Sequence, residues 1–204
     1  MAGKKLRTRG MRIWVNEMKE DERQFFHIFL GIASILLVQF FGVQLASYAV
    51  GAVLIVGIIL VHMKLSRMGL GPLEYLVERF ERPGVTPGYG AMTMAAGTLA
   101  CLTLIARPEY VLASLCMLGF GDAGSTLLGI RSKKKLPWSR EKTYGGTLAF
   151  FLFSLPALYF AGVPALAVGA AAAIAESFES NIDDNLIISV VCVIGFRLVS
   201  LAGF

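Results

Sequence analysis

The sequence contains few charged residues. Asp, Glu, Lys and Arg make up 16% of its 204 residues, whereas soluble domains carry about 25%. Hydrophobic residues make up 56% of the chain, and the mean hydropathy is +0.68. This composition argues against a water-soluble domain and favours an integral membrane protein.

Cysteine is also scarce. Cys101, Cys116 and Cys192 lie in apolar runs, and none belongs to a C-x-x-C pair. Isolated cysteines in apolar surroundings are typical small core residues. The sequence therefore predicts neither a disulfide nor a zinc site.

Several catalytic motifs are missing. The chain has no G-x-x-x-x-G-K-[ST] P-loop, no H-E-x-x-H and no G-x-S-x-G. Residues 119–124, GFGDAG, do match G-x-G-x-x-G, the glycine pattern of dinucleotide-binding folds. That pattern needs a preceding strand within a βαβ unit, whereas residues 110–118 belong to an apolar helix. We interpret the match as accidental, and the glycines as points where the backbone can bend near Asp122.

Long apolar runs, in contrast, are abundant. A membrane-spanning helix needs roughly 20 apolar residues, and the chain offers about seven such stretches. We therefore expect an all-α, polytopic membrane helix bundle with about seven transmembrane helices. The runs are Phe25–Met63, which divides into two helices near Gly42, then Gly88–Ala106, Tyr110–Ile130, Gly146–Ala161, Pro164–Phe178 and Leu186–Phe204. Pro156 should kink the fifth helix, and Pro164 suits the first turn of the sixth.

The distribution of Lys and Arg predicts the orientation. Segments 1–24, 64–87, 131–145 and 179–185 hold seven, four, six and zero of them, which is 17 of the 19 in the chain. Cytoplasmic loops carry this excess, so we expect the N-terminus inside and the C-terminus outside. We divide the chain into a basic, amphipathic cytoplasmic arm, 1–24, and a single integral-membrane catalytic domain, 25–204.

Two stretches have the periodicity of amphipathic interfacial helices. Apolar residues recur at helical spacing through Leu73–Arg82 and again through Met11–Met18. Each stretch can serve simply to anchor and orient the bundle at the membrane surface. For Leu73–Arg82, the alternative is that it borders a path by which a lipid enters.

One acid, Asp122, lies inside the fourth apolar run. An acid at membrane depth costs about 2.5–3.5 kcal/mol on insertion scales, so it normally faces the bundle interior and a partner. A structural pair with Arg197, on the last helix, is one explanation. We favour the other, a functional site.

Further polar groups should gather with Asp122 on the cytoplasmic side. Carboxylates can hold Mg²⁺, cations neutralise polyphosphate, and the N-terminus of a helix starting at Gly145–Thr147 offers N–H donors to an anion. This combination points to phosphate chemistry. The candidate groups are His27, Asp122, Ser125, Thr126, Arg131, Lys133, Lys134, Lys135, Arg140, Lys142, Thr143, Gly145, Gly146, Thr147, Glu176, Asp183, Asp184 and Asn185. Lys133–Lys135 can equally serve topology and contact with anionic lipid.

At these residues the chain resembles the CTP-dependent lipid kinases, which include dolichol kinase, phytol kinase and the CTP-using diacylglycerol kinases. The resemblance rests on three blocks in order: GDAGSTLLG before the basic loop, KTYGGTLAFF after it, and AAAIAESFESNIDDNLIIS. ERQFFHIFLG and ERPGVTPGYGAMT are similar to weaker upstream motifs. The likeness covers about residues 22–200, with Gly145 standing where many members carry an acid.

The resemblance implies transfer of the γ-phosphoryl group of CTP to the hydroxyl of a membrane lipid alcohol, with Mg²⁺ or another divalent cation. The expected catalytic residues are Asp122, Lys142, Glu176 and His27. Nucleotide and phosphate would be bound by Gly121, Lys142, Thr143, Gly145, Gly146, Thr147, Asn185 and Arg140. Metal would be bound by Asp122, Asp183 and Asp184, and Asp122 can alternatively accept the proton of the alcohol.

The expected partners are CTP, the lipid alcohol and the bilayer, with no nucleic acid; homo-oligomerisation stays open. One rival function is a cytidylyltransferase that makes a CDP-lipid, which needs the same ingredients. Another is a lipid transporter or flippase, which intramembrane acids and Arg197 would suit. The one-sided clustering of charge and the short outer connections argue against a transporter.

Overall fold

The computed structural model describes residues 2–69, 71, 86 and 88–203, with side chains described from residue 20 onward. Within these residues the fold is all-helical, as expected from the apolar runs. Their single pairing of extended backbone is an isolated bridge between Lys135 and Thr143. The expected interfacial helix at Leu73–Arg82 lies outside the described residues.

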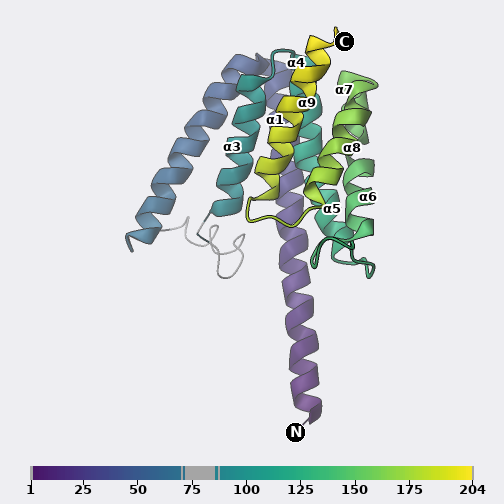
Figure 1. Cartoon of the computed structure of the whole chain (residues 1–204). Helices are drawn as coiled ribbons and strands as arrows, with labels where there is room; N and C mark the ends of the chain where they lie inside the picture. The colour runs from purple at the N-terminus through teal and green to yellow at the C-terminus, as the bar shows by residue number, and fades with distance from the viewer. Residues whose placement is uncertain (1, 70, 72–85, 87, 204) are drawn as a thin grey trace.

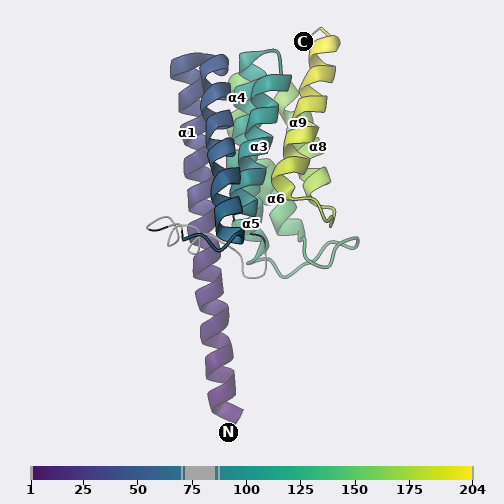
Figure 2. The ribbon, with the colours of Figure 1, turned by 90° about the vertical axis from the view of Figure 1, so that its left-hand side faces the viewer.

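Helix α1, Ala2–Leu65, is two helices joined by a sharp reversal at Gly42. Gly42 has φ 81° and ψ 165°, a conformation that glycine adopts without steric cost. The chain therefore runs up one side of the bundle and back down beside it (Figures 1 and 2). This confirms the helical hairpin expected near Gly42. We call residues 2–41 the first arm and residues 43–65 the second arm.

The first arm differs from expectation near its start. The helix continues without a break from residue 2 across the predicted boundary at 24/25. Figure 1 shows it projecting straight beyond the end of the bundle. The segment Met11–Met18 is thus part of this rod rather than a separate helix lying across the bundle end. The physical reason is local, because residues 2–41 contain no proline to interrupt the helix.

The centre of the bundle is a composite rod of three helical segments. Helix α4, Pro108–Cys116, leads into a π-helical turn, η1, Met117–Gly121, and then into α5, Asp122–Gly129. This rod corresponds to the predicted run Tyr110–Ile130. Most of it is buried, including Met117 and Leu118. The other helices therefore pack around it and leave much apolar surface facing outward.

The remaining helices surround this rod (Figure 2). Helix α6, Tyr144–Phe153, meets α7, Leu158–Ala161, through a 3₁₀ turn, η2, at Leu155–Ala157. That turn contains Pro156, so the expected kink is confirmed. Helix α8, Pro164–Glu176, begins at Pro164, as predicted. Helices α3, Tyr89–Leu104, and α9, Asp184–Leu201, complete the described bundle and pack on one another.

Four described stretches are long and apolar enough to cross a membrane. They are Glu20–Leu65, Pro108–Gly129, Tyr144–Ala161 and Asp184–Leu201. Two further apolar helices, Tyr89–Leu104 and Pro164–Glu176, are shorter. The described part of the chain therefore has the composition and helix lengths of a membrane protein.

The first arm and the central rod touch through two glycines. A Cβ placed on Gly31 would lie 2.8 Å from the Cα of Gly119, and a Cβ on Gly119 would lie equally close to Gly31. Such small residues let two membrane helices approach closely. Because only hydrogen fits between these backbones, the contact sets the distance between the two helices.

We expect Gly119→Ala to separate these helices and to destabilise the protein by about 1–3 kcal/mol, the usual cost of overpacking. Gly51→Ala is the matched control, because a Cβ at Gly51 meets nothing within 4 Å. Alanine also favours helix over glycine at both sites. Heating the detergent-solubilised proteins and measuring the monodisperse fraction should show a lower midpoint for Gly119→Ala only. Equal midpoints for the two variants would contradict the close contact.

Candidate functional site

Asp122 opens α5 at the end of the bundle opposite the C-terminus (Figure 1). Its side chain is buried, with the whole residue 6% exposed. The π-helical turn just before it, Met117–Gly121, inserts an extra residue per turn into the rod. Turns of this kind are frequent at functional sites. The predicted intramembrane acid is therefore held inside the bundle.

The first arm faces Asp122 across an antiparallel seam. His27 Nδ1 lies 3.5 Å from Asp122 Oδ2, and His27 is itself buried. One turn further up is the contact between Gly31 and Gly119. At the open end, Arg131 Nη2 donates to Asp21 Oδ2 at 2.7 Å. The seam thus places His27 beside Asp122, as the sequence predicted for this level of the first helix.

A second group of charges meets around the Lys142 ammonium. Lys142 Nζ donates to Glu176 Oε1 and, at 2.8 Å, to Asp184 Oδ2. Ser125 Oγ also donates to Glu176 Oε1, at 3.1 Å. These side chains come from α5, the 130–143 loop, the end of α8 and the start of α9. We call Ser125, Lys142, Glu176 and Asp184 the ionic cluster.

The His27–Asp122 pair and the ionic cluster interact electrostatically. Asp184, Glu176 and Lys142 all lie within electrostatic range of the Asp122 carboxyl. Burial lowers the pKa of Lys142, but the carboxylates of Glu176 and Asp184 outweigh burial and raise that pKa above its ordinary value. The Lys142 contribution to stability is therefore complete at neutral pH and is lost only as the pH rises through the raised pKa.

The turn at Thr143–Thr147 is built mainly for packing. Thr143 caps α6, its Oγ1 accepting from Gly146 N at 3.1 Å. Tyr144 N donates to the Lys134 carbonyl and Thr147 N to the Thr143 carbonyl. A Cβ on Gly146 would lie 3.0 Å from the Ser125 carbonyl oxygen, and one on Gly145 would lie 2.8 Å from Ser132. Of the three N–H groups at Gly145–Thr147 that were expected to face an anion, those of Gly146 and Thr147 thus donate within the described protein.

Asp183, predicted as a metal ligand, acts as the N-cap of α9. Its Oδ1 accepts from Asn185 N at 3.1 Å and from Asn185 Nδ2 at 2.8 Å. Asn185 is buried, and its Nδ2 also lies 3.4 Å from Thr93 Oγ1 on α3. The pair therefore fixes the start of α9, and with it the position of Asp184.

The basic residues of the 130–143 loop have different neighbours. Lys142 belongs to the ionic cluster, whereas Lys135 Nζ donates to the Glu141 carbonyl at 2.6 Å and Lys134 lies over the ring of Tyr144. Arg140, expected to bind phosphate, is exposed and contributes its backbone N–H to Glu179 Oε2 at 3.0 Å. The structure does not bring its guanidinium into the ionic cluster.

The alternative pairing of Asp122 with Arg197 is not found. Arg197 Nε donates to the Leu104 carbonyl at 2.9 Å, near the far end of α3. Asp122 instead lies beside His27. Arg197 therefore satisfies the C-terminal turn of α3, where exposed carbonyls need donors.

The carboxylates can be tested against the Mg²⁺ that the resemblance implies. Within the described residues, no group of three or more His, Cys, Asp or Glu side chains has the spacing to hold a metal alone. Mg²⁺ usually takes only one or two carboxylates and completes its shell with water and substrate phosphates. Asp122 and Asp184, two of the predicted metal ligands, each supply oxygen donors of that kind. They fit a metal that arrives with a phosphate ligand.

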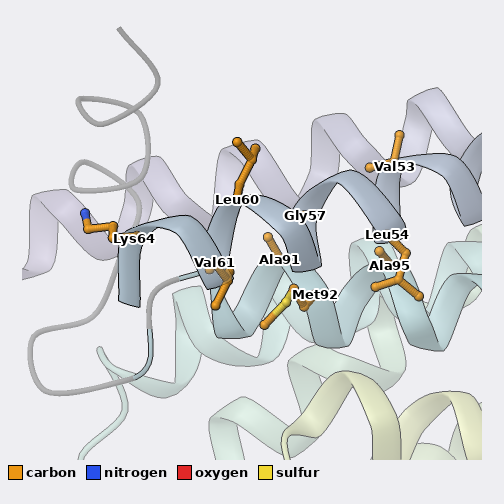
Figure 3. A pocket seen from close by; sticks show the side chains of 10 residues that line it. Val53, Leu54, Gly57, Leu60, Val61, Lys64, Ala91, Met92 and Ala95 are labelled. Atoms are coloured by element: carbon orange, nitrogen blue, oxygen red, sulfur yellow. The ribbon is translucent and has the colours of Figure 1, made fainter. Parts of the chain in front are cut away.

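A groove of about 180 Å³ lies elsewhere, between the second arm of α1 and α3 (Figure 3). Leu54, Val61 and Met92 line it, with Lys64 at one end. Met92 faces this groove, whereas the next residue, Thr93, is buried and contacts Asn185. Helix α3 therefore separates the apolar groove from the ionic cluster.

Two features of the site were not predicted. Gln24 on the first arm is 2% exposed. It belongs to segment 1–24, which we interpreted as a basic, amphipathic segment in the cytoplasm. Asp21 pairs with Arg131 across the seam. The spacing of Asp21, Gln24, His27 and Gly31, at intervals of three and four residues, is the signal that could have revealed this face.

Together the fold and site define a helical protein with membrane-length apolar helices and a partly buried ionic cluster at one end. A protein from Methanocaldococcus jannaschii, described as uncharacterized protein MJ1137, is 31% identical over 172 residues, which cover 83% of this chain and 88% of that protein. The chain belongs to the same family as MJ1137. No family model matches the chain, and no solved structure matches it.

We expect Lys142→Met to destabilise the protein by roughly 1–3 kcal/mol, because Glu176 loses its main partner while buried. Adding Glu176→Gln should restore part of that loss by removing the orphaned charge. Lys134→Met, which removes an exposed lysine from the same loop, is the control. Thermal unfolding at neutral pH measures all three, and a Lys142→Met midpoint equal to that of Lys134→Met would count against the ionic cluster.

Proposed function

We propose that the protein transfers the γ-phosphoryl group of CTP to the hydroxyl of a membrane lipid alcohol. The observation that carries this proposal is the ionic cluster beside Asp122, inside one end of an apolar helix bundle. A lysine and several carboxylates in a water-poor site suit a reaction between a polyphosphate and a lipid. The choice of CTP rests on the resemblance of the three sequence blocks.

The donor phosphates would bind on the Lys142 side of Asp122. Lys142 is held between Glu176 and Asp184, so its charge is positioned before any ligand arrives. A cation positioned in advance neutralises the phosphate charge without reorganising during the reaction. When bound with the nucleotide, Mg²⁺ would be held by Asp184 and would neutralise further phosphate charge, which leaves Asp122 as the base.

The acceptor alcohol would meet the γ-phosphoryl group at Asp122. Its oxygen forms a bond to the γ-phosphorus while the bond from that phosphorus to the β–γ bridging oxygen breaks. CDP leaves with the bonding electron pair, and the hydroxyl proton passes to the Asp122 carboxylate. His27, 3.5 Å from that carboxylate, would hold it in place. Holding the two substrates together supplies much of the rate enhancement in such a reaction.

We further propose a seven-crossing topology with the N-terminus inside and the C-terminus outside. The two arms of α1 would count as two crossings, and α3 and α8 as short ones. The distribution of Lys and Arg supports this orientation. It would place the ionic cluster on the cytoplasmic side, where CTP is available, while the bilayer delivers the alcohol.

Cysteine labelling tests the topology. Lys133→Cys and Ser180→Cys should react with a membrane-impermeant maleimide only from the cytoplasmic face, and Val163→Cys only from the outside. All three positions are exposed. The native cysteines are buried, so the wild-type chain serves as the unreactive control. Labelling of positions 133 and 180 from opposite faces would rule out the seven-crossing arrangement.

Product analysis tests the reaction. The purified protein, given γ-labelled CTP and a total lipid extract, should place the label in a lipid phosphate and release CDP. A cytidylyltransferase would instead release labelled pyrophosphate from the same CTP. Label found in pyrophosphate alone would mean that the protein is a cytidylyltransferase and not a kinase. If neither CDP nor pyrophosphate is released, both proposed activities are rejected.

In that assay, Asp122→Asn should remain folded and lose at least about a hundredfold in turnover, the range of a lost electrostatic contact with the transition state. Asp21→Asn is the matched control, since Asp21 lies on the same seam in a pair with Arg131. It should keep turnover within a few-fold of wild type. Equal activities of the two variants would remove Asp122 from the mechanism.

A further inference from the structure

Gln24 is a buried polar residue that the proposed mechanism does not use. Its residue is 2% exposed, which places it among the most buried large side chains of the protein. Its Nε2 donates to Glu20 Oε1 at 2.9 Å. Its Oε1 is buried and has no hydrogen-bond partner in the described part of the chain. A buried acceptor left without a donor costs about 1–3 kcal/mol.

The orientation of this amide follows from its neighbour. An ionised carboxylate only accepts hydrogen bonds, so Glu20 must face the amide nitrogen of Gln24 rather than its oxygen. Rotating the amide by 180° would place Oε1 against the Glu20 carboxylate and lose that bond. Glu20 therefore holds Oε1 in a position where it can accept a hydrogen bond from something else.

The antiparallel seam places Gln24 near the site. Gly31 meets Gly119, His27 meets Asp122, and Asp21 meets Arg131. Gln24 lies between His27 and Asp21 on the same face of the first arm, since residues three and four apart in a helix share a face. It therefore lies one turn from His27, which is the residue of the first arm beside Asp122.

Asp122 thus has two chemically different sides. Toward α8 and α9 lie the charged groups Lys142, Glu176 and Asp184. Toward the first arm lies His27, and one turn further along that arm is the neutral acceptor of Gln24. A phosphate needs the cation, whereas a neutral amide oxygen attracts an uncharged ligand that can donate a hydrogen bond.

We propose that Gln24 binds the hydroxyl of the acceptor lipid, accepting its hydrogen bond through Oε1 on the first-arm side of Asp122. This inference rests on the proposed lipid alcohol kinase. In the complex before reaction, the hydroxyl donates to Gln24, and its oxygen lone pairs stay free to face the phosphorus. The proton passes to Asp122 only as the new P–O bond forms. Gln24 is therefore a substrate-binding residue that selects for a hydrogen-bond donor.

The proposal predicts how replacing Gln24 changes the melting temperature of the ligand-free protein. Gln24→Met removes the unsatisfied oxygen and also the hydrogen bond from Nε2 to Glu20, so the comparison is made in a Glu20→Ala background, where that bond is already absent. If the Gln24 oxygen served only the fold, adding Gln24→Met would lower the melting temperature of Glu20→Ala. If its acceptor awaits a ligand, we expect the double variant to melt at the same temperature as Glu20→Ala or higher, and a lower one would contradict the proposal.

The binding test uses geranylgeraniol and 1,2-dioctanoylglycerol, each compared with its methyl ether, which lacks the hydroxyl donor. Binding to the detergent-solubilised protein without nucleotide is measured as the ligand-induced rise in melting temperature across a concentration series. Wild type should bind at least one alcohol about three- to tenfold more tightly than its ether, the range of one hydrogen bond. Gln24→Met should lose this preference, as should the shorter Gln24→Asn.

Gln39→Met is the matched control, because Gln39 lies exposed on the same arm. It should keep the wild-type preference. A preference for alcohol retained in Gln24→Met and Gln24→Asn, or absent from wild type for both pairs, would overturn the proposal. The binding test contains no nucleotide, so its outcome does not depend on the product analysis. If phosphoryl transfer fails, the kinase is rejected, and the preference for alcohol over ether still tests the role of Gln24.

Discussion

The structure depends on neutralising carboxylates that are buried among apolar helices. Glu176 is 3% exposed, and its charge is balanced by Lys142, which also reaches Asp184. One ammonium therefore joins the end of α8, the start of α9 and the loop that precedes α6. Removing one partner of such a set leaves an uncompensated charge, which is far more costly than never having buried it. This constraint explains why four separate chain segments converge at one end of the bundle.

The groups around Asp122 differ from one side to the other. On the side of α8 and α9 lie the Lys142 ammonium and the carboxylates of Glu176 and Asp184. On the other, the first arm contributes His27 and an amide, and it approaches so closely that glycines face each other at Gly31 and Gly119. The close packing leaves little room between the first arm and the central rod at that level. A reaction between a charged donor and an uncharged acceptor matches this division.

Much of the fold could be predicted because it depends on local signals. Gly42 marks the reversal of α1, Pro156 the break between α6 and α7, and Pro164 the start of α8. Asp122 and Glu176 were also foreseeable, since charges within apolar sequence need partners, and Lys142 and Asp184 were among the polar groups expected at the same end. Gln24 was not, because its burial depends on the register of two helices about a hundred residues apart in the chain. The roles of Gly146 in packing and Asp183 in capping likewise depend on neighbours that the sequence does not reveal.

The unbroken first arm has a consequence for how the site can change. A straight helix transmits rotation along its axis, and each residue of shift turns a side chain by about 100°. The Gly31–Gly119 contact, one turn from His27, leaves no space for a side chain between the two backbones and so fixes this angular phase. Turning the projecting N-terminal part of the rod would therefore strain this contact as it moved His27 away from Asp122.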